Sequence, residues 1–92
     1  LERASAIGRT SFATFFFLGE AYRDSHRLDR AIPAYREAAR LEPEFAQAWF
    51  ELGVAYQRTG QRDEASSVLG VLEKLDPTLA KELKKRVEFG GK

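Results

Sequence analysis

Few residues in this chain could carry out chemistry, and none has the partner that catalysis requires. The 92 residues include one histidine, His26, and no cysteine. This excludes paired-histidine catalysis, a multi-histidine metal site, a cysteine nucleophile and a disulfide. The five serines stand in no nucleophile-elbow sequence, and the acidic residues are scattered as on solvated helix faces. We therefore predict that the chain is not an enzyme, with no catalytic residue, no metal and no cofactor.

Basic side chains gather at Lys84, Lys85 and Arg86. This short run lacks interleaved aromatic residues, so we interpret it as a solvated helix face and predict no binding to nucleic acid. Fifteen Lys and Arg offset fourteen Asp and Glu, which gives no general attraction to an anionic partner. No apolar run approaches the roughly 18 residues that a membrane helix needs, so we predict no membrane insertion. The chain begins at Leu1 and contains no methionine. We interpret it as a segment of a longer soluble protein, with the cytoplasm favoured over the periplasm.

The apolar residues of the chain recur in an internal repeat, and this repeat predicts the helices that position them. Shifted by 34 residues, the sequence matches itself at nine positions without a gap. The matching pairs are Phe16/Phe50, Leu18/Leu52, Gly19/Gly53, Ala21/Ala55, Tyr22/Tyr56, Asp29/Asp63, Ala31/Ala65, Leu41/Leu75 and Pro43/Pro77. In each unit an aromatic residue, Leu-Gly and Tyr recur at offsets of three, four and seven, which places them on one helix face. A fixed period of this length predicts stacked helical hairpins.

These positions resemble the tetratricopeptide repeat family. Its pattern is aromatic-x2-Leu-Gly-x2-Tyr, then Ala-x3-aromatic, then Pro, with a period of 34 residues. Both units are similar to it over residues 12–79, although Leu69 and Leu72 replace the usual aromatic residue and alanine in the second. The resemblance implies an all-α fold of right-handed superhelical α–α hairpin repeats with five helices.

The expected organisation is two repeats between an N-terminal lead-in and a C-terminal capping helix. These parts are assigned to residues 1–11, 12–45, 46–79 and 78–92. The lead-in is interpreted as the end of a preceding repeat whose helix stops at Gly8. We expect helices near residues 12–25, 28–41, 46–59, 62–75 and 78–89.

Individual residues predict how these helices end and approach one another. Gly60 should end a helix in a left-handed turn, and His26 takes the equivalent place in the first unit. Asp76 should cap the last helix, with Pro77 at its first position. Each repeat glycine should lie against the alanine of the second helix in its hairpin, which pairs Gly19 with Ala31 and Gly53 with Ala65.

In the family that the chain resembles, the first helix of each hairpin lines a concave face that binds the ligand. Carried over position by position, the resemblance assigns partner binding to Phe16, Phe17, Glu20, Arg23, Gln47, Phe50, Glu51, Val54, Gln57, Lys81 and Lys85. Some family members hold a chaperone's C-terminal carboxylate with five basic and amide side chains. Here Glu20 and Glu51 occupy two of those places and would repel a carboxylate, so we predict a different partner. The remaining surface is an apolar ledge of Phe16, Phe17, Phe50 and Val54 with a charged rim.

We therefore predict a protein–protein interaction module, part of a larger scaffold or adaptor protein. It should dock a peptide or helix with apolar and basic anchors. The alternative is a self-association unit that assembles homodimers or larger homo-oligomers. A further alternative is that Phe16 and Phe50 pack on each other and on the last helix without binding a partner.

Overall fold

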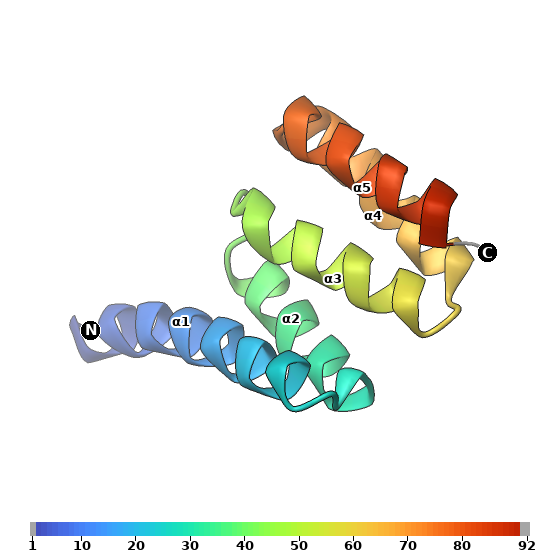
Figure 1. Ribbon diagram of the computed structural model, residues 1–92. Coiled ribbons are helices and arrows are strands. Elements are labelled where there is room, and N and C mark those ends of the chain that lie inside the picture. The colour runs from blue at the N-terminus through green and yellow to red at the C-terminus, as the bar shows by residue number, and fades with distance from the viewer. Residues whose placement is uncertain (1, 91–92) are drawn as a thin grey trace.

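The computed structural model describes the backbone of residues 2–90 and the side chains of residues 12–86. It contains five helices: α1 Glu2–Asp24, α2 Leu28–Leu41, α3 Ala46–Arg58, α4 Arg62–Leu75 and α5 Pro77–Gly90. The all-α prediction is confirmed, and residues 2–90 contain no strand. Figure 1 shows the helices following one another from α1 to α5, with α3 between the first hairpin and the C-terminal helix. Four of the five helices lie within two residues of their predicted bounds.

The first helix differs from the prediction at its N-terminus. It begins at Glu2 and continues through Gly8 to Asp24, so the prediction that a helix ends at Gly8 is wrong. A single glycine inside a helix costs only about 1 kcal/mol relative to alanine, and the same stretch contains Ala4, Ala6 and Arg9, which are good helix formers. The N-terminal part of α1 consequently projects beyond the other helices (Figure 1).

The predicted turn residues are confirmed. His26 has a φ of 62° and Gly60 a φ of 81°, both in the left-handed region. Asp76 caps α5, because its Oδ1 accepts hydrogen bonds from the backbone N–H of Thr78 at 3.1 Å and of Leu79 at 3.3 Å. The two hairpins are therefore closed by equivalent left-handed turns, and α5 begins at a side-chain cap followed by proline.

Two glycines with open space around them should respond to alanine with opposite signs. A Cβ at Gly60 or at Gly70 would meet no atom within 4 Å, so packing is the same in both cases. Gly60→Ala should lower the free energy of unfolding by about 1 kcal/mol or more, because an L-residue is strained at positive φ. Gly70→Ala, inside α4, should raise it by up to about 1 kcal/mol through helix propensity. Urea denaturation of both variants checks this, and equal effects would contradict the left-handed turn at Gly60.

The core consists of residues from α2, α3, α4 and α5. Its fully buried larger side chains are Tyr35, Leu72 and Leu83. Each repeat glycine lies in a close helix contact, as expected, but the nearest side chains are not those of the predicted alanines. A Cβ at Gly19 would lie 2.8 Å from ring atoms of Tyr35. A Cβ at Gly53 would lie 2.6 Å from Leu83 Cδ2 and 3.0 Å from Val68 Cγ1, so its nearest neighbours belong to α5 and α4.

The last helix packs on both helices of the second hairpin. Its inner face carries Ala80 and Leu83, both buried against the core formed with α3 and α4. Its outer face is charged, and the exposed side chains are Lys81, Glu82, Lys84, Lys85 and Arg86. The helix α5 therefore covers the apolar side of the second hairpin with its inner face and presents its polar outer face to solvent.

Candidate protein-interaction site

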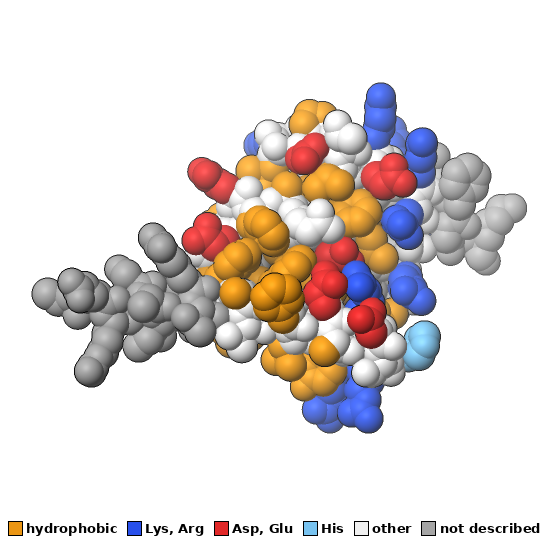
Figure 2. All heavy atoms as spheres, turned by 60° about the vertical axis from the view of Figure 1, so that its left-hand side comes forward, with side chains coloured by type: hydrophobic (Ala, Val, Ile, Leu, Met, Phe, Trp, Pro, Cys, Tyr) orange, Lys and Arg blue, Asp and Glu red, His pale blue; other side chains and the backbone are white. Residues whose placement is uncertain are grey.

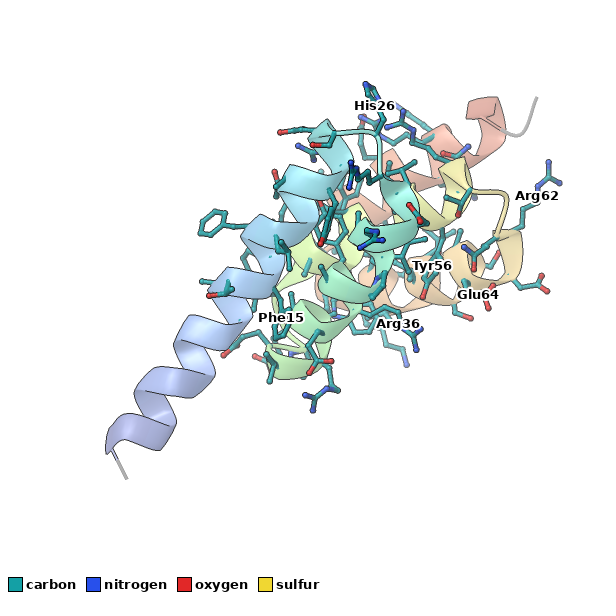
Figure 3. The ribbon with its side chains drawn as sticks, turned by 90° about the horizontal axis from the view of Figure 1, so that it is seen from below. Phe15, His26, Arg36, Tyr56, Arg62 and Glu64 are labelled. Carbon is teal, nitrogen blue, oxygen red and sulfur yellow. The ribbon has the colours of Figure 1, made fainter. Side chains whose placement is uncertain are left out.

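The part of the chain that the structure describes contains no cluster of metal-ligating side chains. No group of three or more His, Cys, Asp or Glu side chains there lies close enough to hold a metal ion. His26 is exposed at the turn between α1 and α2 and points away from the helices (Figure 3). Among the described residues, no helix is both long and apolar enough to cross a membrane.

Four phenylalanines gather where α1 meets the start of α3, and we call Phe12, Phe16, Phe17 and Phe45 the aromatic patch. The Phe45 ring contacts those of Phe12 and Phe16 edge-on, with centroids 4.9 Å and 5.3 Å away. Phe17 contacts Phe16 at 6.0 Å. Phe17 is 67% exposed and Phe45 37% exposed. Figure 2 shows hydrophobic side chains beside a cluster of acidic and basic ones near the middle of the view. The patch therefore presents an aromatic surface to solvent.

Phe45 was missed by the sequence analysis. It lies in the connection between the two hairpins, directly before α3, whereas the resemblance carried over positions only from the first helix of each hairpin and from the last helix. One signal was present in the sequence, because Phe45 stands 34 residues before Leu79, another apolar residue. The connection is therefore part of the surface that α1 and α3 form.

Next to the aromatic patch lies a charged cluster centred on Arg23. Its guanidinium forms ion pairs with Glu51 at 2.9 Å, Glu20 at 3.1 Å and Asp24 at 3.2 Å. Gln47 Nε2 donates a hydrogen bond to Glu51 at 3.1 Å. Arg23 thus links α1 to α3, and three carboxylates surround one guanidinium. The cluster keeps an excess of negative charge beside the patch.

Burial shifts the ionisation of two groups in this region. Burial raises the pKa of Glu20, and the positive charge of Arg23 offsets part of that rise. Burial also raises the pKa of Tyr35, as do the negative charges of Glu51 and Glu20. The Tyr35 hydroxyl is buried and has no hydrogen-bond partner among the described residues. The floor of the charged cluster is therefore a neutral aromatic ring with an unpaired polar atom.

The structure brings some of the predicted site residues of α1 and α3 together, in the aromatic patch and around Arg23, but it buries two others. Phe50 and Val54 are each only 8% exposed and belong to the core with Leu83. The Arg86 guanidinium carbon lies 5.8 Å from the Phe50 ring centroid, within cation–π range. The expectation of an exposed apolar ledge is therefore wrong at Phe50 and Val54, because α5 packs against this part of α3.

The other predicted residues fall into two groups. The half-buried ones are Phe16, Glu20, Arg23, Gln47, Glu51 and Gln57. The exposed ones are Phe17, Lys81 and Lys85. The acids expected to form a free rim instead pair with Arg23 of the same chain. What remains open to a partner is the aromatic patch, the negative margin of the Arg23 cluster and the lysines of α5.

Comparison with known proteins finds the same repeat family that the sequence pattern resembles. The sequence profile described as TPR repeat matches residues 19–60, and one described as Tetratricopeptide repeat matches residues 46–78. The chain is 31% identical over 69 residues to Tetratricopeptide repeat protein 37 of Xenopus laevis, covering 75% of this chain. It is 33% identical over 67 residues to Superkiller complex protein 3 of Mus musculus, covering 73% of this chain. The matched region spans 4% of the length of each of these relatives.

Proposed function

This chain belongs to the tetratricopeptide repeat family, whose repeats generally serve as protein–protein interaction modules, and we propose that its aromatic patch docks a helix or extended peptide of a partner protein. The observation that carries the proposal is the exposure of Phe17, at 67%, whose ring contacts Phe16, which in turn contacts the partly exposed Phe45. Exposed aromatic side chains that adjoin one another are typical of interaction surfaces, and aromatic anchors dominate interface energetics.

The charge beside the patch defines the chemistry of the partner. The three carboxylates around Arg23 leave an excess of negative charge there. A partner with an aromatic or aliphatic anchor next to a Lys or Arg would therefore match both surfaces. Because charges at an interface steer encounter, raised salt should slow this association. A chaperone peptide that ends in a carboxylate does not fit, since its negative charge would be repelled by the negative charge around Arg23.

A role within a larger scaffold or adaptor is consistent with the relatives. Each is many times longer than the matched region, and the mouse relative is named as a protein of a complex. In such a protein the module would supply one docking surface among several.

Self-association is the second candidate, because the same exposed Phe17 ring could pack against its counterpart in another copy. Sedimentation equilibrium separates the two functions. A monomer across the micromolar range supports docking of a different partner. A dimer that Phe17→Ser dissociates supports self-association.

The docking function predicts that Phe17→Ser weakens partner binding by more than about 1 kcal/mol, which is about fivefold or more. The binding probes are helical peptides selected from a displayed random library on the wild-type chain, and affinities are measured by fluorescence anisotropy. We expect the selected peptides to be enriched in aromatic or aliphatic residues next to Lys or Arg.

Leu18→Ser is the matched control. Leu18 is the neighbouring exposed apolar residue, at 40%, but it does not belong to the aromatic patch. Circular dichroism should show both variants fully helical. If the selected peptides bind the Phe17→Ser variant as tightly as the wild type, the patch is not the docking surface.

A further inference from the structure

The Arg23 cluster holds more negative charge than its own cation neutralises. Three carboxylates, those of Glu20, Asp24 and Glu51, share one guanidinium. Gln47 adds only a neutral donor to Glu51. The cationic side chains of α5 form no ion pair with these carboxylates in the described part of the chain. The cluster therefore has acceptor groups for a second cation.

The Tyr35 hydroxyl lies at the floor of this cluster. The ring carbon that carries it would lie 3.0 Å from a Cβ at Gly19, the residue directly before Glu20. Besides burial, the charges of all four members of the cluster shift the pKa of Tyr35, so the hydroxyl faces them. Tyr35 is 0% exposed, and its hydroxyl has no hydrogen-bond partner among the described residues. Because buried polar atoms without a partner are rare, this hydroxyl indicates a contact that forms in another state of the site.

Arg23 divides its hydrogen bonds between a buried and an exposed side of the cluster. On the buried side, Nη1 donates to Glu51 at 2.9 Å and Nη2 donates to Glu20 at 3.1 Å. On the exposed side, Nε and Nη2 donate to Asp24 Oδ1 at 3.4 Å and 3.2 Å. The Glu51 side chain is 12% exposed, whereas that of Asp24 is 72% exposed. Arg23 can therefore release its buried partners and stay paired with Asp24 in solvent.

The aromatic patch adjoins this cluster through shared residues. Phe16 contacts the Phe17 ring at 6.0 Å and the Tyr35 ring at 5.9 Å. Phe16 and Glu20 stand four residues apart in α1, so they lie on one helix face. Figure 2 shows hydrophobic side chains beside the acidic and basic ones. A partner held at the patch can therefore place a neighbouring side chain in the cluster.

The acceptor groups of the cluster select a cation with several N–H donors. The carboxylates of Glu20 and Glu51 accept hydrogen bonds, and the Tyr35 hydroxyl can accept one more. An ammonium or a guanidinium supplies such donors, and hydrogen bonds between ionised groups are roughly twice as strong as neutral ones. The described carboxylates do not form a group that could hold a metal ion. The expected cation is therefore a side chain.

We propose that a lysine or arginine side chain of the docked partner replaces Arg23 between Glu20 and Glu51. The Tyr35 hydroxyl becomes its third acceptor, and Arg23 moves to Asp24. The proposal rests on the docking function of the aromatic patch and adds how the site recognises its partner. In the free chain Arg23 acts as an internal competitor that occupies the cation site. A partner therefore needs both an apolar anchor and a neighbouring cation to use the whole surface.

The test uses pairs of peptides that differ by one charge. Peptides selected from the displayed library on the wild-type chain supply the cationic form. In the neutral form, the lysine or arginine beside the anchor is replaced by norleucine or citrulline, respectively. Both affinities are measured by fluorescence anisotropy. We call the ratio of the neutral to the cationic dissociation constant the cation preference.

Arg23→Met should raise the cation preference about fivefold or more, because it removes the internal competitor and keeps an apolar stem. Tyr35→Phe separates this effect from a general attraction by the added negative charge. It should lower the preference about threefold or more, since one acceptor is lost, and leave the neutral peptide unchanged. Glu20→Gln should also lower the preference. Glu37→Gln is the matched control, because Glu37 pairs with Arg40 outside the cluster, and it should change nothing.

Three outcomes would overturn the proposal. The first is a set of selected peptides without lysine or arginine beside the anchor. The second is a cation preference that is unchanged or lower in folded Arg23→Met. The third is a preference that Tyr35→Phe leaves unchanged, which would place the cation at the outer edge of the cluster. Circular dichroism checks folding, and the Tyr35→Phe result decides the case if Arg23→Met does not fold.

This proposal and the docking function fail separately. The neutral peptide tests docking alone, because Phe17→Ser should weaken it whether or not a cation site exists. If the neutral peptide depends on Phe17 but no cation preference appears, the patch docks a partner and the cation site is wrong. If neither peptide depends on Phe17, the docking function itself is wrong.

Discussion

Tyr35→Ala should lower the free energy of unfolding by about 3–5 kcal/mol, the range for truncating a buried aromatic side chain. Tyr35 is 0% exposed. Its ring fills the space left by Gly19 and contacts Phe16 edge-on, with centroids 5.9 Å apart. Total stability of small domains is about 5–15 kcal/mol, so this loss could unfold the chain. The measurement is urea denaturation followed by circular dichroism.

Tyr35→Phe is the matched control, because it keeps the ring and removes only the hydroxyl. That hydroxyl has no hydrogen-bond partner among the described residues, and an unsatisfied buried polar group costs about 1–3 kcal/mol. We expect the phenylalanine variant to be as stable as the wild type or more stable. A loss above about 1 kcal/mol would show that the hydroxyl is hydrogen-bonded in solution.

Gly53→Leu should be the most disruptive substitution at a repeat glycine. A Cβ at Gly53 would lie 2.6 Å from Leu83 Cδ2 and 3.0 Å from Val68 Cγ1. Overpacking a close contact costs about 1–3 kcal/mol or more. Helix propensity favours the same substitution by up to about 1 kcal/mol, so the two effects oppose each other and overpacking should win.

The same change at an open site separates these two effects. A Cβ at Gly70, inside α4, would meet no atom within 4 Å, so Gly70→Leu should gain the propensity term without the clash. The midpoint temperature of thermal denaturation should therefore fall for Gly53→Leu and rise for Gly70→Leu. If Gly53→Leu were the more stable variant, α3 could not lie close to α4 and α5 at this glycine.

The sequence predicted the features that depend on neighbouring residues along the chain. The left-handed turns at His26 and Gly60 and the cap at Asp76 follow from local patterns, and the structure confirms them. The prediction of where α1 begins was wrong for a local reason as well. Gly8 was interpreted as a helix end, although a single glycine does not outweigh the helix formers around it.

The features that depend on distant residues could not be predicted in the same way. Helical periodicity places Phe50 and Val54 on a face of α3, but their burial depends on how α5 crosses that face. The nearest neighbour of Gly53 could not be predicted for the same reason, since Leu83 is 30 residues away along the chain. Arg23 and Glu20 stand at a spacing that indicates an ion pair on a helix, whereas the pair of Arg23 with Glu51 joins two helices.

The central position of α3 determines the order in which this chain comes apart. It has extensive contacts with α2, α4 and α5, whereas α1 has them only with α2. Partially open states should therefore lose an end of the molecule before its middle, as in other arrays stabilised by neighbouring units. Release of α5 would uncover Phe50, Val54 and the contact at Gly53 together. That form exposes more apolar surface than the closed one, and it is the form in which misassembly between copies would begin.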